Sequence, residues 1–404
     1  MNSDVLVIGA GVVGSAIAFH AADRNLGAVE VVDRNTVGSG MSCRSSALVR
    51  SHYPFPPEIE LAVRSRQMFD AWPDLVGEPS VIRQTGWVKI VPGDEAPHLR
   101  ANVEVQKRLG GEVELVTSDE LSELAPELHT DDIEFAAWEE HGGYGDGAAV
   151  AGDLLAAARG RGVAYRPKTL VRSLVRSGDR ITGVETADGV LSAGVVVLAA
   201  GVWSRPLLRE VGLEELIELE FGRVAILRHR EDAGASVACT DVTTGTYFRP
   251  DSGRYGTLVG GHGHRGSREG IDPDHVPASA VPEELVDLVE SASHRAPRLL
   301  DAGIAGGTTG VYDMTPDSRP LLGKIFGLEG LILAVGFSGT GFKISPAVGE
   351  SIVALIEGRP RDAVDITAFR PSRFEEGRPI RPEFPYAAEE PPSDSGPLRS
   401  RAGC

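Results

Sequence analysis

Three short apolar runs recur along the chain, and each is followed by a glycine. They cover residues 4–8, 195–200 and 331–335. Continuous apolar runs of this length, rich in β-branched residues, are typical of strands buried in a parallel sheet. The pattern therefore predicts one sheet that is assembled from three distant parts of the chain.

The stretches between these runs have a different pattern. Apolar and polar residues alternate over residues 81–91, 221–228 and 246–262, as in antiparallel strands that expose one face, and residues 283–290 fit a short helix. We therefore expect an α/β fold, α+β overall, in which a Rossmann-like nucleotide-binding domain carries an inserted antiparallel-sheet domain for the substrate. The first domain is assigned residues 1–80, 145–212 and 306–374, and the inserted domain residues 81–144 and 213–305. Residues 375–404 are rich in Pro, Glu, Ser and Arg and are expected to be a disordered tail.

A glycine-rich turn follows the first apolar run. Gly9, Gly11 and Gly14 precede a segment of helical periodicity, and Asp33 follows a second apolar run, 19 positions after Gly14. In a dinucleotide-binding unit the first glycine permits a tight turn, the second admits the pyrophosphate, and the third lets helix and strand pack closely. The distal acid accepts a hydrogen bond from a ribose hydroxyl, while the helix N-terminus faces the anion. The spacing therefore predicts a bound dinucleotide.

Charge and cysteine content narrow the possible partners. Acidic residues outnumber basic ones 58 to 40, giving a formal net charge of −18, so neither nucleic acid nor an anionic membrane is expected as a partner. Cys43, Cys239 and Cys404 are far apart and fit no zinc or dithiol site. His262 and His264 share one face of an expected strand without a third ligand nearby, so no metal site is expected. We expect a cytoplasmic protein, because no apolar stretch reaches the roughly 18 residues of a membrane span.

A second glycine-rich stretch follows the third apolar run and leads into a helix. We expect Ser345 to be the N-cap of this helix and Pro346 its first residue. The positive end of a helix stabilises negative charge, and a reduced flavin carries an anion at its pyrimidine end. The return of the chain to the nucleotide-binding domain therefore favours FAD over NAD.

Five segments together resemble the FAD-dependent D-amino-acid oxidase, glycine oxidase and sarcosine oxidase superfamily. They are residues 5–15, 46–53, 198–204, 310–317 and 334–343, and the resemblance spans nearly the whole chain to about residue 374. Residues 312–317, Tyr-Asp-Met-Thr-Pro-Asp, are most similar to the branch of the sarcosine oxidase beta subunit and dimethylglycine dehydrogenase. The resemblance implies FAD held by Gly9, Gly11, Val12, Val13, Gly14, Asp33, Arg34, Ser45, Ser46, Ala200, Gly201, Trp203, Gly336, Ser338, Gly339, Thr340, Gly341, Phe342 and Lys343.

Three departures from the family pattern limit this transfer. Gly310 stands where monomeric sarcosine oxidases carry the cysteine that bonds the flavin, so non-covalent FAD is expected. Tyr312 stands where glycine and D-amino-acid oxidases place an arginine for the substrate carboxylate. Residues 143–147 lack the histidines that accompany a second flavin in the beta-subunit branch.

The resemblance also implies a set of substrate-site residues. Lys343 and Arg50 are the cations expected to bind a substrate carboxylate, although Lys343 also fits a surface ion pair and Arg50 a flavin phosphate. His262 matches a family active-site histidine, and Tyr247 and Arg249 either face the cavity or pack in the sheet. Leu258 stands where monomeric sarcosine oxidases place a lysine over the flavin.

The chemistry implied by the family is oxidation of a C–N bond in a carboxylate-bearing amine, such as an N-methyl or D-amino acid, to an imine that hydrolyses. The electron acceptor is either O₂ or another oxidant. Two alternatives remain: oxidation of a 2-hydroxy acid on the same fold, and a flavin-bearing subunit whose activity requires partner chains.

Overall fold

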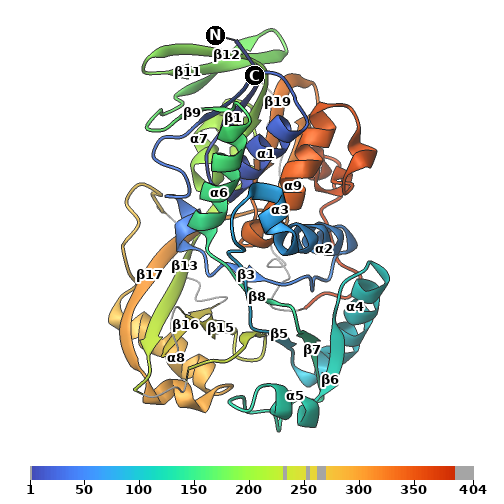
Figure 1. Ribbon diagram of the computed structural model, residues 1–404, viewed down its shortest axis with the longest axis vertical. Helices are drawn as coiled ribbons and strands as arrows, with labels where there is room; N and C mark the ends of the chain where they lie inside the picture. The colour runs from blue at the N-terminus through green and yellow to red at the C-terminus, as the bar shows by residue number, and fades with distance from the viewer. Residues whose placement is uncertain (1, 231–233, 252–254, 262–269, 387–404) are drawn as a thin grey trace.

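The computed structural model describes residues 2–230, 234–251, 255–261 and 270–386. His262, His264 and residues 387–404 lie outside the described residues. Figure 1 shows two domains arranged along the long axis of the molecule, each built on a sheet of its own. No helix in the described ranges is long and apolar enough to cross a membrane.

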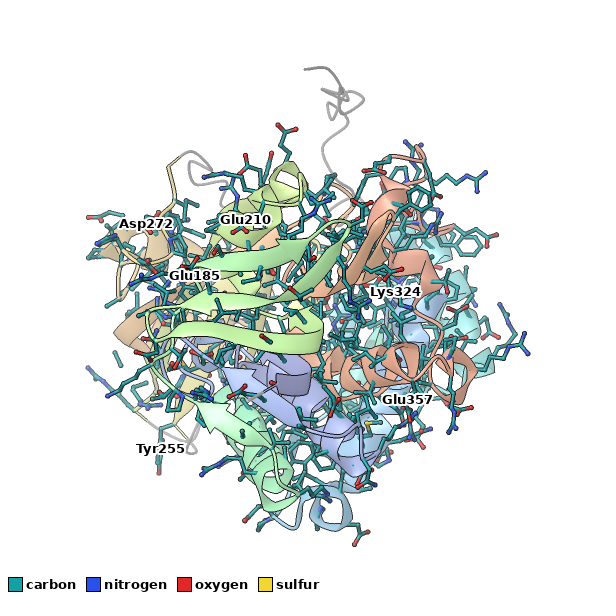
Figure 2. The ribbon with its side chains drawn as sticks, turned by 90° about the horizontal axis from the view of Figure 1, so that it is seen from above. Glu185, Glu210, Tyr255, Asp272, Lys324 and Glu357 are labelled. Carbon is teal, nitrogen blue, oxygen red and sulfur yellow. The ribbon has the colours of Figure 1, made fainter. Side chains whose placement is uncertain are left out.

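The first domain contains the expected sheet of distant segments. Its central strands β1 (Asn2–Ile8), β2 (Val29–Val32), β12 (Gly189–Leu198) and β19 (Leu328–Val335) pair in parallel. The sheet order is β10 (Ser173–Ser177), β11 (Arg180–Thr186), β19, β12, β1, β2 and β9 (Ala164–Arg166), with β18 (Leu321–Ile325) paired to β19. The three predicted apolar runs therefore lie side by side. Seen from above, acidic side chains such as Glu185 and Glu210 project from this domain (Figure 2).

Helices cover the first sheet. They include α1 (Val12–Asp23), α2 (Pro56–Asp70), α3 (Trp72–Val76), α6 (Gly147–Gly160), α7 (Arg205–Arg209) and α9 (Gly341–Ile356). Helix α1 packs against both α6 and α9 and is buried along nearly its whole length. Gly349 permits the approach of α9, because a Cβ at this position would lie 2.7 Å from the backbone of Ala16. Small residues thus bring α1 and α9 into close contact.

The second domain is an eight-stranded, mainly antiparallel sheet. Its order is β17 (Gly303–Met314), β13 (Glu218–Arg228), β16 (Gly256–Gly261), β15 (Thr246–Pro250), β14 (Ala238–Asp241), β5 (Trp87–Ile90), β7 (Phe135–Glu139) and β6 (Glu114–Thr117). Helices α4 (Ala96–Arg108), α5 (Ser118–Leu124) and α8 (Pro282–Ser293) lie in the same domain (Figure 1). A small sheet of β3 (Leu48–Val49), β8 (Gly143–Tyr144) and β4 (Arg83–Gln84) joins the chain segments between the domains.

Two details of the second sheet differ from the expected pattern. All four residues of β5 are buried, whereas residues 81–91 were expected to alternate in exposure. Strand β17 begins at Gly303 and pairs with β13, so residues 306–314, assigned to the first domain, contribute a strand to the second sheet. Strand β5 is buried on both faces because Trp87 packs in one apolar cluster and Val88 and Ile90 pack in another.

Helix α9 begins four residues before the expected N-cap. The helix starts at Gly341 and passes through Pro346. Proline has no N–H to donate to the carbonyl four residues before it, which belongs to Phe342. The Ser345 hydroxyl donates to that carbonyl at 2.9 Å instead. Ser345 therefore does not cap the helix but replaces the hydrogen bond that Pro346 cannot form.

Part of the expected tail is folded. Residues 375–386 lie within the described structure, and the side chain of Tyr386 is fully buried. The backbone N–H of Ile380 donates to Asp317 at 2.9 Å, and Asp317 forms a buried ion pair with Arg373 at 2.8 Å. The expectation of disorder is therefore wrong for residues 375–386.

Candidate active site

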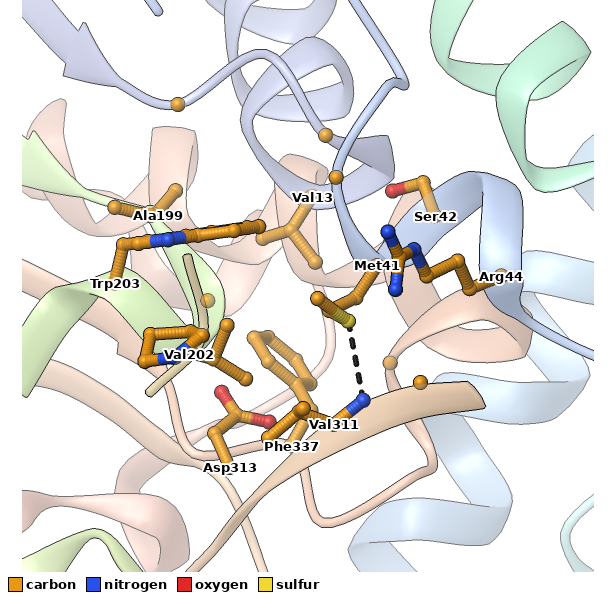
Figure 3. Close-up of a pocket in the computed structure, with 18 of the residues that line it drawn as sticks. Val13, Met41, Ser42, Arg44, Ala199, Val202, Trp203, Val311, Asp313 and Phe337 are labelled. Atoms are coloured by element: carbon orange, nitrogen blue, oxygen red, sulfur yellow. Dashed lines mark hydrogen bonds between the residues drawn. The ribbon is translucent and has the colours of Figure 1, made fainter. Parts of the chain in front are cut away.

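A cavity of about 750 Å³ runs from the first glycine turn toward the second sheet (Figure 3). This volume lies within the roughly 300–1,000 Å³ that is usual for ligand pockets. Most of the expected cofactor residues line it: Gly9, Gly11, Val12, Val13, Asp33, Arg34, Ser45, Ser46, Ala200, Gly201, Trp203, Gly339, Gly341 and Phe342. The cavity therefore joins segments that the sequence places more than 300 positions apart.

Other expected residues lie behind this wall. Gly14, Gly336, Ser338, Thr340 and Lys343 are not among the residues that line the cavity. Gly336 has a φ of +71°, and its N–H donates to the Asp313 carboxylate at 2.8 Å. The Ser338 hydroxyl accepts from the N–H of Thr315 at 3.1 Å. Gly336 and Ser338 thus fix the shape of the loop rather than present atoms to the cavity.

The first turn leaves no room for side chains at Gly9 and Gly14. Gly9 has a φ of +106°, and a Cβ there would lie 2.5 Å from the carbonyl oxygen of Ala199. A Cβ on Gly14 would lie 1.9 Å from the carbonyl oxygen of Gly9. A Cβ on Gly11 would meet only the Ser42 hydroxyl oxygen, at 3.1 Å, so the turn is open to the cavity at this position.

Asp33 and its neighbours form the end of the cavity next to β2. The Asp33 carboxylate accepts from the N–H groups of Ala10 and Asn35, both at 2.7 Å. Arg34 lies over the Trp203 ring, with Cζ 5.4 Å from the centroid. Arg34 and the Trp203 indole N–H both contact the Asp274 carboxylate at 2.7 Å. These contacts hold the loop at Asp274, which belongs to the second domain, across this end of the cavity.

The opposite end lies under β17. The sulfur of Met41 accepts from the N–H of Val311 at 3.2 Å, and Figure 3 shows this bond between the cavity walls. Arg44 donates to the carbonyl of Thr309 at 2.9 Å. Asp313 also lines the cavity, and burial raises the pKa of its carboxyl to about 6.

These features fit the dinucleotide FAD. A tight glycine turn, in which a Cβ on Gly9 or Gly14 would overlap backbone atoms, stands at the N-terminus of α1, and Asp33 follows β2 where a dinucleotide-binding unit carries its ribose-binding acid. The second glycine loop lies at the N-terminus of α9, where Gly339 and Gly341 meet the same cavity. Among the described residues, no three His, Cys, Asp or Glu side chains come together as a metal site.

Comparisons with known proteins agree with this geometry. The family model described as FAD dependent oxidoreductase matches residues 4–355. The chain belongs to this family of FAD-dependent oxidoreductases. FAD is therefore its cofactor, and the expected class of FAD-dependent amine or amino-acid oxidoreductase is confirmed.

Individual relatives cover the chain almost completely. A glycine oxidase of Geobacillus kaustophilus is 28% identical over 386 residues, which are 92% of this chain and 97% of that protein. A sarcosine oxidase subunit beta of Rhizobium meliloti is 26% identical over 387 residues, 93% of this chain and 89% of that protein. The solved structure of L-proline dehydrogenase from P. horikoshii matches this chain with a TM-score of 0.84 and 26% sequence identity, and the match covers 94% of this chain and 99% of that one. The expected superfamily and branch are thereby confirmed.

The two cations expected in this oxidoreductase to bind substrate meet at one aromatic ring. The Cζ of Arg50 lies 4.4 Å from the centroid of Tyr53, and the Nζ of Lys343 lies 5.9 Å from it. Arg50 also lies 5.1 Å from the Trp87 centroid. Lys343 is only 8% exposed, which contradicts its alternative role in a surface ion pair. Neither cation is part of the FAD cavity wall itself.

Two tyrosines meet inside the cavity. Tyr247 and Tyr312 both line it and are hydrogen-bonded to each other. Burial raises the pKa of Tyr247, and the neighbouring Tyr247 holds the pKa of Tyr312 well above its usual range. Both hydroxyls therefore stay protonated at neutral pH. The sequence placed Tyr53 and Tyr312 within family segments without assigning either a role in the substrate site, and no motif included Trp87.

Arg249 serves the fold more than the cavity. Its Nε donates to the carbonyl of Ser46 at 2.7 Å, and its Cζ lies 4.3 Å from the Tyr144 centroid. Burial lowers the pKa of this guanidinium, which is not among the groups that line the cavity. Arg249 thus ties β15 to the loop at Ser46. His262, the remaining expected site residue, lies outside the described residues.

Proposed function

We propose that this chain oxidises the C–N bond of a carboxylate-bearing amine, an N-methyl or D-configured amino acid. The observation that carries the proposal is the convergence of Arg50 and Lys343 on Tyr53. Two cations that share one partly desolvated site attract a carboxylate strongly. Relatives named glycine oxidase, sarcosine oxidase subunit beta and N-methyl-L-tryptophan oxidase support an amino-acid substrate.

The proposed carboxylate site lies beside the FAD cavity. Lys343 follows the cavity residue Phe342 in α9, and Arg50 follows β3, four positions after Ser46. Trp87, which contacts Arg50, packs in one apolar cluster with the cavity residues Tyr247 and Val224. A carboxylate bound by the cations thus places the adjoining carbon and nitrogen toward the cavity.

FAD supplies the acceptor for the hydride equivalent that leaves the carbon next to nitrogen. The protein binds and orients the substrate and surrounds it with fixed dipoles. Tyr247 and Tyr312 donate hydrogen bonds but do not remove the ammonium proton, because their pKa values are raised. The substrate therefore reacts as the free amine, whose nitrogen lone pair supports the forming C=N bond. The imine leaves the protein and takes up water to give a carbonyl compound together with an amine from an N-methyl amino acid or ammonia from a D-amino acid.

Anaerobic bleaching of the flavin tests this proposal. A panel of N-methyl, D-, L- and cyclic amino acids and 2-hydroxy acids is mixed with the protein without oxygen. We expect bleaching by one class of amino acid, at a rate that rises with pH as the amine loses its proton. Bleaching by 2-hydroxy acids alone would replace the proposal with the hydroxy-acid alternative.

Substitution of the cations tests the site. Arg50→Met and Lys343→Met each remove one partner of a desolvated ion pair and should raise KM by roughly 10²-fold while FAD stays bound. Lys324→Met is the matched control, because Lys324 is an exposed residue of β18 (Figure 2). Unchanged kinetics in both site variants would refute the carboxylate role.

A second candidate is a flavin-bearing subunit of a larger oxidase. It is supported by the similarity to two sarcosine oxidase beta subunits, which are 24% and 26% identical to this chain. Size-exclusion chromatography with turnover assays on the purified chain separates the two cases. A chain whose flavin is bleached but which turns over only with added partner chains would establish the second candidate.

A further inference from the structure

Residues 375–386, here called the C-terminal segment, cross from the first domain to the second and bring Tyr386 beside the proposed carboxylate site. Ile380 is bound to Asp317 in the first domain. The carbonyl of Phe384 accepts from Asn102 of α4 at 2.8 Å, and the carbonyl of Pro385 pairs with the His98 ring at 2.7 Å. The ring of Tyr386 then enters an apolar cluster of the second domain and is fully buried.

A chain of buried hydrogen bonds begins at the Tyr386 hydroxyl. This hydroxyl lies 2.7 Å from Nε2 of His52, whose Nδ1 lies 2.9 Å from Oε1 of Gln106. The Gln106 amide nitrogen donates to Glu139 of β7 at 2.7 Å. Because a carboxylate only accepts, Gln106 presents its NH₂ to Glu139 and its oxygen to His52. His52 therefore donates through Nδ1, and its neutral form accepts a hydrogen bond from the Tyr386 hydroxyl through Nε2.

The same chain holds the backbone next to Arg50. The N–H of Ser51 donates to the Glu139 carboxylate at 2.8 Å. The carbonyl of His52 accepts a hydrogen bond from the Arg50 guanidinium. Both residues that follow Arg50 are thus fixed by the second domain, and one of them binds the guanidinium directly. His52 is 1% exposed, so water does not replace a lost partner easily.

We propose that Tyr386 is a positioning residue for the substrate carboxylate. Its hydroxyl fixes the ring of His52, and the carbonyl of His52 fixes the guanidinium of Arg50 over Tyr53 and Trp87. Pre-orientation of a binding group reduces the freedom that is lost when substrate binds. Tyr386 therefore contributes to substrate affinity, although it lies 334 positions after His52 in the sequence. This inference rests on the proposed role of Arg50.

Tyr386→Phe in the full-length holoenzyme tests it. The change removes one hydroxyl and keeps the ring that fills the apolar cluster. We expect KM for the carboxylate-bearing substrate to rise about 3- to 10-fold, the size of one lost hydrogen bond, with less than a twofold change in kcat. KM for the same amine without its carboxylate should not change. A dissociation constant for acetate, measured from the flavin absorption spectrum, should rise by the same factor.

Asn102→Ala is the matched control. It frees the same segment at Phe384 but leaves the Tyr386 hydroxyl in the chain. We expect it to lower Tm without changing KM. A Tyr386→Phe variant with lower Tm and unchanged KM and acetate affinity would show a structural role only and would overturn the inference. If Arg50→Met and Lys343→Met both leave KM unchanged, the proposed carboxylate site itself fails. If Arg50→Met raises KM and Tyr386→Phe does not, only the positioning role fails.

Discussion

Gly14→Ala is the sharpest test of the nucleotide turn. A Cβ on Gly14 would lie 1.9 Å from the carbonyl oxygen of Gly9 and 3.0 Å from its carbonyl carbon. Both obstacles are backbone atoms, so no side-chain rotation relieves the overlap. Helix α1 or the turn must move by about 1 Å, and Gly9 is part of the cavity wall.

The expected loss follows from this overlap. Overpacking of a rigid site costs about 1–3 kcal/mol, and a backbone obstacle places Gly14→Ala at the upper end. About 3 kcal/mol corresponds to roughly 150-fold in affinity, so FAD binding should weaken at least 10²-fold. Gly152 in α6 offers a matched control, because a Cβ there meets nothing within 4 Å. Gly152→Ala should leave FAD affinity unchanged and stabilise the fold by up to about 1 kcal/mol.

Titration of the apoproteins with FAD measures both variants. Quenching of flavin fluorescence gives the dissociation constant, and Tm with and without FAD separates a loss of binding from a loss of fold. A Gly14→Ala protein with the affinity of the parent chain would show that the close contact between α1 and the turn is not needed to bind FAD.

Three further predictions concern the cavity. Acid precipitation should release all flavin to the supernatant, because Gly310 has no side chain to bond it; yellow colour in the pellet would contradict this. Burial raises the pKa of Asp313 to about 6, so the folded form holds this proton more tightly than the unfolded form and loses stability as pH rises from about 4 to 6. Asp313→Asn should remove this dependence of the unfolding free energy on pH. Urea unfolding of both apoproteins at several pH values measures the two slopes, and equal slopes would refute the prediction. Asp274→Asn should release FAD about two- to fivefold faster in stopped-flow displacement, since its partly exposed contact with Arg34 holds the cavity end closed; an unchanged rate would show that this contact does not retain FAD.

Local features of the fold could be predicted from the sequence. The contact of Gly14 with Gly9 and the helix that follows involve residues close together in the sequence, so their spacing carries the information, whereas the limit on space at Gly9 comes from the distant Ala199. The start of α9 was predicted wrongly, because a serine before a proline normally signals an N-cap. Here the Ser345 hydroxyl compensates for the proline within the helix, and this becomes visible only in three dimensions.

Long-range contacts limited the prediction of the site. Arg50 and Lys343 were found through family motifs, and Tyr53 lies in the same segment as Arg50, but nothing in that segment shows that both cations meet at its ring. The burial of Tyr386 was missed because its segment has the composition of a disordered tail. Its partner His52 lies 334 positions away, and composition contains no information about such a contact.

The last prediction concerns the electron acceptor. Leu258, at the position where the family resemblance implies a lysine, is 7% exposed on β16 and packs among Leu48, Val224 and Tyr247. A fixed cation near a reduced flavin assists oxygen, because it stabilises the negative charge that forms on the oxygen molecule. No such cation stands at position 258, and the guanidinium of Arg249, which pairs with Leu258 from the neighbouring strand β15, donates to the carbonyl of Ser46. We therefore expect fast reduction by substrate, slow reoxidation by air, and acceleration by a dye or quinone.

Leu258→Lys tests this reasoning against Leu258→Met, which keeps the volume and adds no charge. The lysine variant should react faster with oxygen and leave the reductive step unchanged. The apolar neighbours of position 258 would lower the pKa of the new ammonium group, so the gain should increase as pH falls. Stopped-flow mixing of the reduced proteins with oxygen at several pH values gives the rates. Reoxidation of the parent chain at the rate of an ordinary amine oxidase, or equal rates in the two variants, would show that charge at this position does not control the reaction with oxygen.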